Sequence, residues 1–188
     1  MSDRKLLDAE LMKQVAAGDQ SACRSLVEQH LRGLVGLSYR MLSDMAAAED
    51  VAQETFLRLW RTANRWKPEA RISTWLYHVA HNLAIDEIRR RGHMSDQEAP
   101  DTPDPSANQY AAQHQTQVAD QVEAALAQLP VRQRTAITLV HHQELSNIEA
   151  AEIMEISVDA LESLLARGRR KLKELLIDRR RDLVGEME

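Results

Sequence analysis

Cysteine, glycine, proline and aromatic residues are all scarce in this 188-residue chain. The single thiol, Cys23, excludes an internal disulfide and suits a reducing compartment. Because Cys23 lies in a helical run, SACRSLVEQHL, we interpret it as a small buried apolar residue. No apolar run approaches the roughly 18 residues that cross a bilayer, and the N-terminal stretch MSDRKLLDAELMKQ lacks a signal-peptide core. We therefore expect a cytoplasmic protein without direct membrane insertion.

Strand-type alternation is nearly absent as well, while Ala, Leu, Glu, Gln and Arg dominate. The hydrophobic share of 44% and charged share of 28% are typical of a folded globular protein. Every aromatic residue except Tyr110 lies between Tyr39 and Tyr77. The composition predicts an all-α fold.

A net charge of −5 would argue against a nucleic-acid partner if it were spread evenly. Residues 93–120, however, contain five acids and no Lys or Arg, so this segment alone accounts for the whole deficit. Three of the five prolines lie there too, among Ser, Asp, Gln and Asn. Such a composition predicts a flexible acidic linker. We therefore expect two small helical domains, at 1–92 and 120–188, joined by a linker at 93–119.

Apolar periodicity predicts four helices in each domain. Asp19 or Gln20 is placed to cap the second helix and Ser73 the fourth. Ser146 and Glu149 form a capping-box pattern, and Ser157 is placed to cap the last helix. The expected ranges are 8–17, 20–43, 46–64, 72–91, 119–127, 131–143, 146–153 and 158–178.

The stretch DVAQETFLRLW, residues 50–60, has two distinct helical faces. Ala48, Val51, Ala52, Thr55, Phe56 and Leu59 recur at the spacing of a buried face. The opposite face is polar except for one apolar residue, and its members are Asp50, Gln53, Glu54, Leu57, Arg58 and Arg61. A solvated face does not require a leucine, and periodicity alone leaves Leu57 unexplained.

The stretch RISTWLYHVAHNLAIDEIRRR, residues 71–91, also presents two faces. Ile72, Leu76, Val79, Ala80 and Leu83 are expected to pack inward, and Tyr77, His78, His81, Asn82, Ile85, Asp86 and Arg89 to project outward. Amides, imidazoles and arginines in one arc suit contacts to bases and phosphates, and the loop from Trp66 to Ser73 suits an unstacked base. The alternative interpretation is that Trp75 packs in the core and that the arginine run is a solvated helix end, where the helix dipole favours positive charge.

The two short capped helices after residue 146 outline a helix-turn-helix. The second bears Arg167, Arg170 and Lys171 opposite a leucine stripe, as expected for a helix entering the major groove. An ordinary helical hairpin with a solvated basic end is the alternative. Glu162 would be repelled by phosphates unless it accepts a hydrogen bond from a cytosine amine or faces away.

Catalytic and metal-binding patterns are weak. His78 and His81, and the segment His141-His142-Gln143-Glu144, lack a third ligand at a recognisable spacing. No phosphate loop, nucleophile elbow or paired-carboxylate motif is present. We therefore expect neither an enzyme, nor a metal site, nor a cofactor, nor a small-molecule substrate.

Taken in order, EDVAQETFLRLWR, ISTWLYHVAHNLAIDEIRRR and LPVRQRTAITLVHHQELSNIEAAEIMEISVDALESLLARGRRKL resemble the extracytoplasmic-function (ECF) group of the sigma-70 family. The resemblance implies an alternative sigma factor, with region 2 at 1–92 and region 4 at 120–188. Its implied partners are bacterial RNA polymerase core, promoter DNA and an anti-sigma factor, which in this family is often membrane-anchored and would hold the chain at the inner membrane face.

The resemblance also implies residue roles. Asp50, Gln53, Glu54, Leu57, Arg58 and Arg61 would dock on the clamp coiled coil of the polymerase. The implied minus-10 contacts are Arg71, Tyr77, His78, Asn82, Asp86, Arg89 and Arg90. The implied minus-35 contacts are Ser157, Ala160, Glu162, Ser163, Ala166, Arg167, Arg170 and Lys171.

Two departures from the family pattern stand out. The family often has Gly in the turn where this chain has Met154-Glu155, and basic residues where it has Glu162 and Leu164.

A stand-alone DNA-binding regulator that uses only the C-terminal helices is the alternative function. A helical adaptor is a third, although it would need neither basic cluster.

Overall fold

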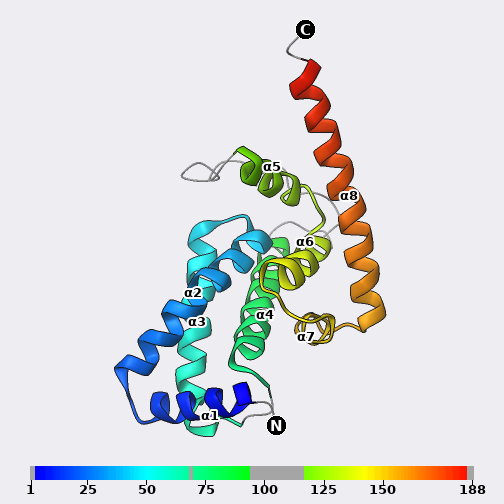
Figure 1. The fold of residues 1–188 in the computed structure, drawn as a ribbon. Helices are drawn as coiled ribbons and strands as arrows, with labels where there is room; N and C mark the ends of the chain where they lie inside the picture. The colour runs from blue at the N-terminus through cyan, green and yellow to red at the C-terminus, as the bar shows by residue number, and fades with distance from the viewer. Residues whose placement is uncertain (1–2, 68–69, 94–116, 186–188) are drawn as a thin grey trace. The chain divides into compact units, whose positions relative to one another are not determined.

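The computed structural model describes residues 3–67, 70–93 and 117–185, and every regular element within these ranges is helical. The chain divides into two compact units, an N-terminal unit with α1 to α4 and a C-terminal unit with α5 to α8 (Figure 1). The prediction of an all-α fold with two helical domains is confirmed. Most of the predicted linker lies outside the described residues, and the domain boundaries stay a prediction.

The N-terminal unit consists of α1 (Asp3–Ala16), α2 (Gln20–Leu42), α3 (Met45–Thr62), the short 3-10 turn η1 (Ala63–Arg65) and α4 (Ile72–His93). Helix α2 packs against both α3 and α4, while α1 lies against η1 and α2. Leucines fill the core of this unit, and fully buried examples are Leu26, Leu34, Leu37, Leu59 and Leu76.

Aspartate residues cap the N-termini of α2 and α3. Asp19 accepts hydrogen bonds from the Ser21 and Ala22 N–H groups, at 2.8 and 3.3 Å, which confirms the expected cap of α2. Asp44 caps α3 by accepting from the Ala47 N–H at 3.1 Å.

The predicted cap of α4 is wrong. Ser73 lies inside the helix, and its hydroxyl is buried without a hydrogen-bond partner. The N–H of Ile72, the first residue of α4, donates instead to Asp8 of α1 at 2.9 Å. A local pattern cannot indicate this cap, because the two residues are 64 positions apart.

The C-terminal unit consists of α5 (Gln117–Leu126), α6 (Val131–Ile137), the π-helical turn η2 (Thr138–His142), α7 (Asn147–Ile153) and α8 (Val158–Gly185). The single helix expected at 131–143 therefore changes its hydrogen bonding part-way. The Gln143 N–H donates to the Thr138 carbonyl, five residues back, at 3.0 Å. Among the described residues, no helix has the length and apolar character needed to cross a membrane.

The helix-turn-helix forms as its caps predict. Ser146 donates from its backbone N–H and its hydroxyl to Glu149, and the Glu149 N–H donates back to Ser146 Oγ at 3.2 Å. The Ala160 N–H donates to Ser157 Oγ at 3.1 Å. In the turn between α7 and α8, Glu155 adopts a left-handed φ of 53°. The predicted leucine stripe of α8 is buried at Leu161, Leu164 and Leu165.

Gly168 continues the leucine stripe and lets α8 lie close to α6. A Cβ atom at this position would come within 2.7 Å of Ile137 Cδ1 and 3.4 Å of Gln133 Cβ. Helix α8 is thereby held by both its cap and its close contact with α6.

Candidate partner and nucleic-acid interfaces

Helix α3 buries the face that its periodicity predicts. Its buried residues are Ala48, Val51, Ala52, Thr55, Phe56 and Leu59. Thr55 satisfies its buried hydroxyl by donating to the Val51 carbonyl at 2.7 Å. The prediction for this face is confirmed in full.

The opposite face of α3 combines charge with a half-buried leucine. Asp50, Gln53, Arg58 and Arg61 are exposed, whereas Leu57 is half-buried between them. Glu54 accepts from Arg58 Nε at 2.9 Å and lies 3.8 Å from Arg61 Nη1. Exposed pairs one helical turn apart contribute only about 0.3–0.5 kcal/mol. These pairs therefore contribute little to the stability of the unit.

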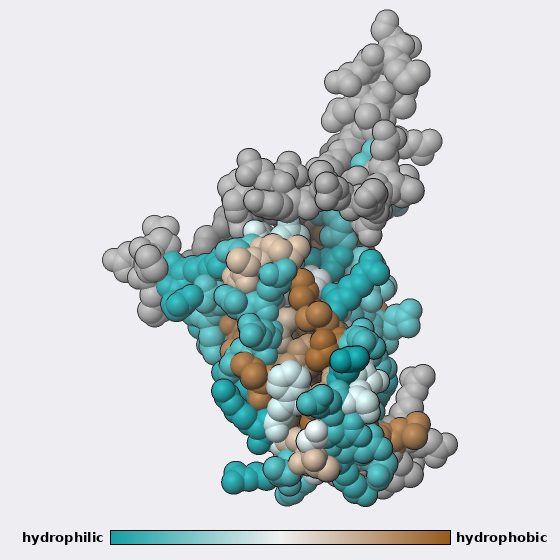
Figure 2. Space-filling view, turned by 90° about the vertical axis from the view of Figure 1, so that its left-hand side faces the viewer, coloured by the Kyte–Doolittle hydropathy of each residue, from teal (hydrophilic) through white to brown (hydrophobic). Residues whose placement is uncertain are grey.

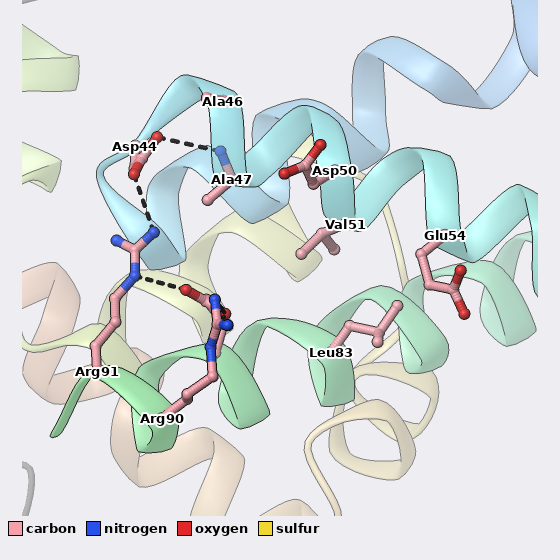
Figure 3. Close-up of a pocket in the computed structure, with 10 residues that line it drawn as sticks. Asp44, Ala46, Ala47, Asp50, Val51, Glu54, Leu83, Arg90 and Arg91 are labelled. Atoms are coloured by element: carbon pink, nitrogen blue, oxygen red, sulfur yellow. Dashed lines mark hydrogen bonds and ion pairs between the residues drawn. The ribbon is translucent and has the colours of Figure 1, made fainter. Parts of the chain in front are cut away.

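A hollow between α3 and α4 brings together residues from two predicted sites (Figure 3). Asp50 and Glu54 line it from the predicted polymerase-docking face, and Arg90 from the predicted minus-10 set. Asp44 and Arg91, which the sequence did not single out, close one end of the hollow through an ion pair of 2.9 Å.

Glu87 organises the arginines at the end of α4. It accepts from Arg91 Nε at 2.8 Å and pairs with Arg90 at 2.7 Å. Hydrogen bonds from Arg90 and Arg91 lower the pKa of Glu87, and its carboxylate in turn raises the pKa of both arginines. The basic run is therefore partly neutralised by its own helix, although the Arg90 side chain stays 77% exposed.

The exposed positions of α4 agree only partly with prediction. Asp86 and Arg89 are exposed, and Arg89 Nη1 lies 3.8 Å from Asp86 Oδ1. Tyr77 and His81, expected to project outward, are buried, with 6% and 7% of their surface exposed. Burial raises the pKa of Tyr77 to about 12. Their polar atoms favour an outer face, but the rest of each ring is apolar enough to pack in a core.

Asn82 lies between two of the predicted histidines. His81 Nδ1 lies 3.3 Å from Asn82 Oδ1, and Asn82 Nδ2 lies 3.4 Å from His78 Nε2. One consistent arrangement has His81 donating and His78 accepting, which leaves the amide of Asn82 oriented by both rings. Within the described residues no group of three potential ligands is suited to a metal ion.

The residues on either side of the start of α4 include a pair of tryptophans and several unsatisfied polar atoms. The rings of Trp66 and Trp75 meet edge-on, with centroids 5.9 Å apart. Trp66 Nε1, Arg71 Nε and Ser73 Oγ are buried and have no hydrogen-bond partner. Buried polar atoms are normally satisfied, and these three are exceptions.

The outward face of α8 carries the predicted minus-35 set. All of its members are exposed: Ser157, Ala160, Glu162, Ser163, Ala166, Arg167, Arg170 and Lys171. Arg167 Nε donates to the Ser163 carbonyl at 3.3 Å. Glu162 accepts from Asn147 Nδ2 of α7 at 3.3 Å, which links the two helices of the motif. This contact, unforeseen from the sequence, fixes the carboxylate on the exposed side of α8.

A second hollow lies where α2 and α3 meet, lined by Gln20, Cys23, Arg24, Val27, Glu28 and Trp60. The sole thiol is partly exposed there, so the prediction of a buried Cys23 is wrong. Trp60 is 36% exposed and stacks on Phe56, with ring centroids 6.1 Å apart. Figure 2 faces the side on which α2 and α3 lie in Figure 1, and it shows apolar residues gathered in a strip with hydrophilic borders.

Comparison with known proteins gives two family matches. Residues 26–94 match Sigma-70 region 2, and residues 119–172 match Sigma-70, region 4. The ECF RNA polymerase sigma factor SigW of Bacillus subtilis (strain 168) is 33% identical over 180 residues, which cover 89% of this chain and 95% of SigW.

Two solved structures are also similar to this chain. CnrH, in complex with the cytosolic domain of CnrY, has 25% identity and a TM-score of 0.65 over 91% of this chain and 97% of CnrH. The sigma factor RpoE, in complex with the anti-sigma factor NepR from Bartonella quintana, has 24% identity and a TM-score of 0.67. That match covers 81% of this chain and 95% of RpoE, and it shows a shared fold.

Proposed function

Because this chain belongs to the ECF sigma factors of the sigma-70 family, we propose that it binds bacterial RNA polymerase core through α3 and selects promoters through α4 and α8. A sigma factor is a transcription initiation factor and not an enzyme. Region 2 is proposed at 1–92 and region 4 at 120–188, with the acidic linker at 93–119 passing through the polymerase.

The two-faced α3 is the observation that carries this proposal. One face of α3 is buried in the core of the unit, and the other presents Leu57 among Asp50, Gln53 and Arg61. A protein-binding surface of this kind joins an apolar centre to a polar rim. We assign the clamp coiled coil of the polymerase as its partner.

The proposed DNA contacts are the predicted residues that are exposed or half-buried. Arg71, His78, Asn82, Asp86, Arg89 and Arg90 are assigned to the minus-10 element, captured as a single strand. Tyr77 is left out because it is buried. The outward face of α8 is assigned to the minus-35 duplex, with Arg167 and Arg170 suited to guanine edges or phosphates.

An anti-sigma factor is the proposed regulator. In the similar structure named above, CnrH is bound to the cytosolic domain of CnrY. A membrane-anchored partner of this kind would hold the present chain at the inner membrane face until released. Coexpression with the protein encoded beside it, followed by co-purification, tests this part of the proposal.

Reconstitution tests the main function. The purified chain should bind core polymerase in a pull-down and support runoff transcription from a subset of promoters that core alone does not use. Binding to duplex DNA without binding to core or initiation would favour the stand-alone regulator. Binding to neither would favour the adaptor.

A further inference from the structure

The first turn of α4 depends on a residue from another helix. The first four N–H groups of an α-helix have no partner within the helix. In α2, α3 and α8 a side chain beside the helix start accepts from one of them. In α4 the Asp8 carboxylate of α1 accepts from the Ile72 N–H, at 2.9 Å and partly buried. Helix α1 therefore supplies a cap that α4 does not supply for itself through Ser73.

Two further basic side chains, His30 and Arg71, lie near the contact between Asp8 and Ile72. His30 of α2 is partly buried, and this burial lowers its pKa. The negative charge of Asp8 opposes that lowering of the His30 pKa, whereas the positive charge of Arg71 adds to it. Side chains from α1, α2 and the start of α4 thus lie close enough to act on one another. A carboxylate here also suits the positive end of the α4 dipole.

Three side chains around this junction each have a buried polar atom without a hydrogen bond. Trp66 Nε1, Arg71 Nε and Ser73 Oγ are buried without partners, and they flank the capped N–H of Ile72. These three atoms contribute no hydrogen bond that would fix the start of α4. The Asp8 bond therefore has more influence on where the start of α4 lies than a surface cap usually has.

We propose that Asp8 is a positioning residue for minus-10 recognition. Its carboxylate sets the start of α4, and so the placement of Arg71 and of the tryptophan pair, without touching DNA itself. The inference rests on the proposed function, because it assigns Asp8 to the same minus-10 surface. It differs from a simple stability role, since it requires base discrimination to change.

The test measures a ratio that partial unfolding does not alter. Full-length chain is assembled with core polymerase and titrated with two fluorescent single-stranded oligonucleotides. One carries the minus-10 sequence of a promoter found by runoff transcription, and the other has a single altered base. The ratio of the two dissociation constants reports discrimination, because a smaller active fraction changes both equally.

Four variants are compared with the unaltered chain. Asp8→Ala should lower the ratio severalfold, because the start of α4 and Arg71 are then no longer held where they distinguish the two bases. Asp8→Asn should retain most of it, because the amide oxygen still accepts from the Ile72 N–H. Asp8→Glu keeps the charge but moves the carboxylate by one methylene, so it should give an intermediate ratio. This variant replaces Asp8→Ala in the comparison if Asp8→Ala folds too poorly to assay. Asp19→Ala is the matched control, since it removes an equivalent carboxylate cap from α2.

The inference is overturned if Asp8→Ala and Asp8→Glu keep the full ratio, or if Asp19→Ala lowers the ratio as much as Asp8→Ala. Failure of the unaltered chain to bind core, or to distinguish the two oligonucleotides, has a different meaning. It overturns the proposed function on which this inference depends.

Discussion

Arg91, in the last turn of α4, donates to Oδ2 of Asp44 at 2.9 Å, and the other carboxylate oxygen of Asp44 caps α3. One side chain therefore connects the start of the proposed polymerase-docking helix to the end of the proposed minus-10 helix. Figure 3 shows Asp44 between its two partners. The contact adds to the packing of α3 against α4 within the N-terminal unit.

Charge removal at Asp44 should give a pH-dependent loss of stability. The Ala47 N–H bond and then the Arg91 pair lower the pKa of Asp44 below its usual 3.8. A lowered carboxyl pKa stabilises the folded state above the unfolded pKa, and this stability is lost as pH falls through the folded value. We expect Asp44→Asn to melt below the unaltered chain at pH 7, with the gap closing below about pH 4.

Asp50→Asn is the control for Asp44→Asn, because it removes the same charge from the same hollow without affecting the cap. Thermal unfolding across the pH range measures both variants. An equal, pH-dependent gap for Asp50→Asn would contradict a specific role for Asp44.

Leu57→Asp should remove core binding. The side chain is half-buried, so we expect a stability loss of only about 1 kcal/mol but a large loss in the polymerase pull-down. Leu31→Asp, at an α2 leucine that is 41% exposed, is the matched control and should bind core normally. Unfolding of Leu57→Asp at room temperature would show that this leucine belongs to the core instead.

Arg167→Ala should weaken transcription that depends on the minus-35 element. Loss of an arginine contact to a base edge costs about 1–3 kcal/mol, which is a factor of five or more in promoter use. Arg169→Ala is matched to it, because Arg169 Nε donates to the Leu165 carbonyl at 3.3 Å as Arg167 Nε does to Ser163. Runoff assays and core pull-downs on both variants should separate them, and equal loss would refute the assignment of Arg167.

Gly168→Ala should destabilise the C-terminal unit, and adding Ile137→Val should restore part of the lost stability. The added Cβ would lie 2.7 Å from Ile137 Cδ1, an atom that valine lacks. Overpacking costs about 1–3 kcal/mol, offset by about 1 kcal/mol of helix propensity. Denaturant unfolding of the single and double variants should give a favourable coupling energy, and additivity would show that the clash is absorbed elsewhere.

Glu155→Gly should stabilise the C-terminal unit. Glu155 holds a φ of 53°, where an L residue is disfavoured by about 1–2 kcal/mol and glycine is not. Glu155→Ala separates this effect from loss of the side chain, because alanine keeps the strain. Calorimetry should show a higher melting temperature for glycine than for alanine, and equal values would rule out strain as the cause.

Short-range patterns predicted much of the fold. All six buried residues of α3 follow from a 3.6-residue repeat, and the caps at Asp19, Ser146 and Ser157 follow from their neighbours. The outward set on α8 follows from the leucine stripe opposite it. In each case the information lies within a few helical turns.

The remaining features depend on tertiary contacts. Tyr77 and His81 are buried because packing around α4 extends beyond one periodic stripe, and Asp8 meets Ile72 across 64 positions. Neither Asn147 with Glu162 nor Asp44 with Arg91 has a sequence signal, because each pair joins different helices. The partner contacts of the exposed residues stay predictions.

The distant cap at Asp8 has a consequence for folding kinetics. Helices α2, α3 and α8 carry their own start signals, so their first turns can nucleate in the unfolded chain. The Ile72 N–H at the start of α4 gains its acceptor only when Asp8, 64 positions earlier, comes close. Amide hydrogens there should gain exchange protection late, and they should lose it whenever α1 undocks. Docking of α1 thereby adds stability to the first turn of α4.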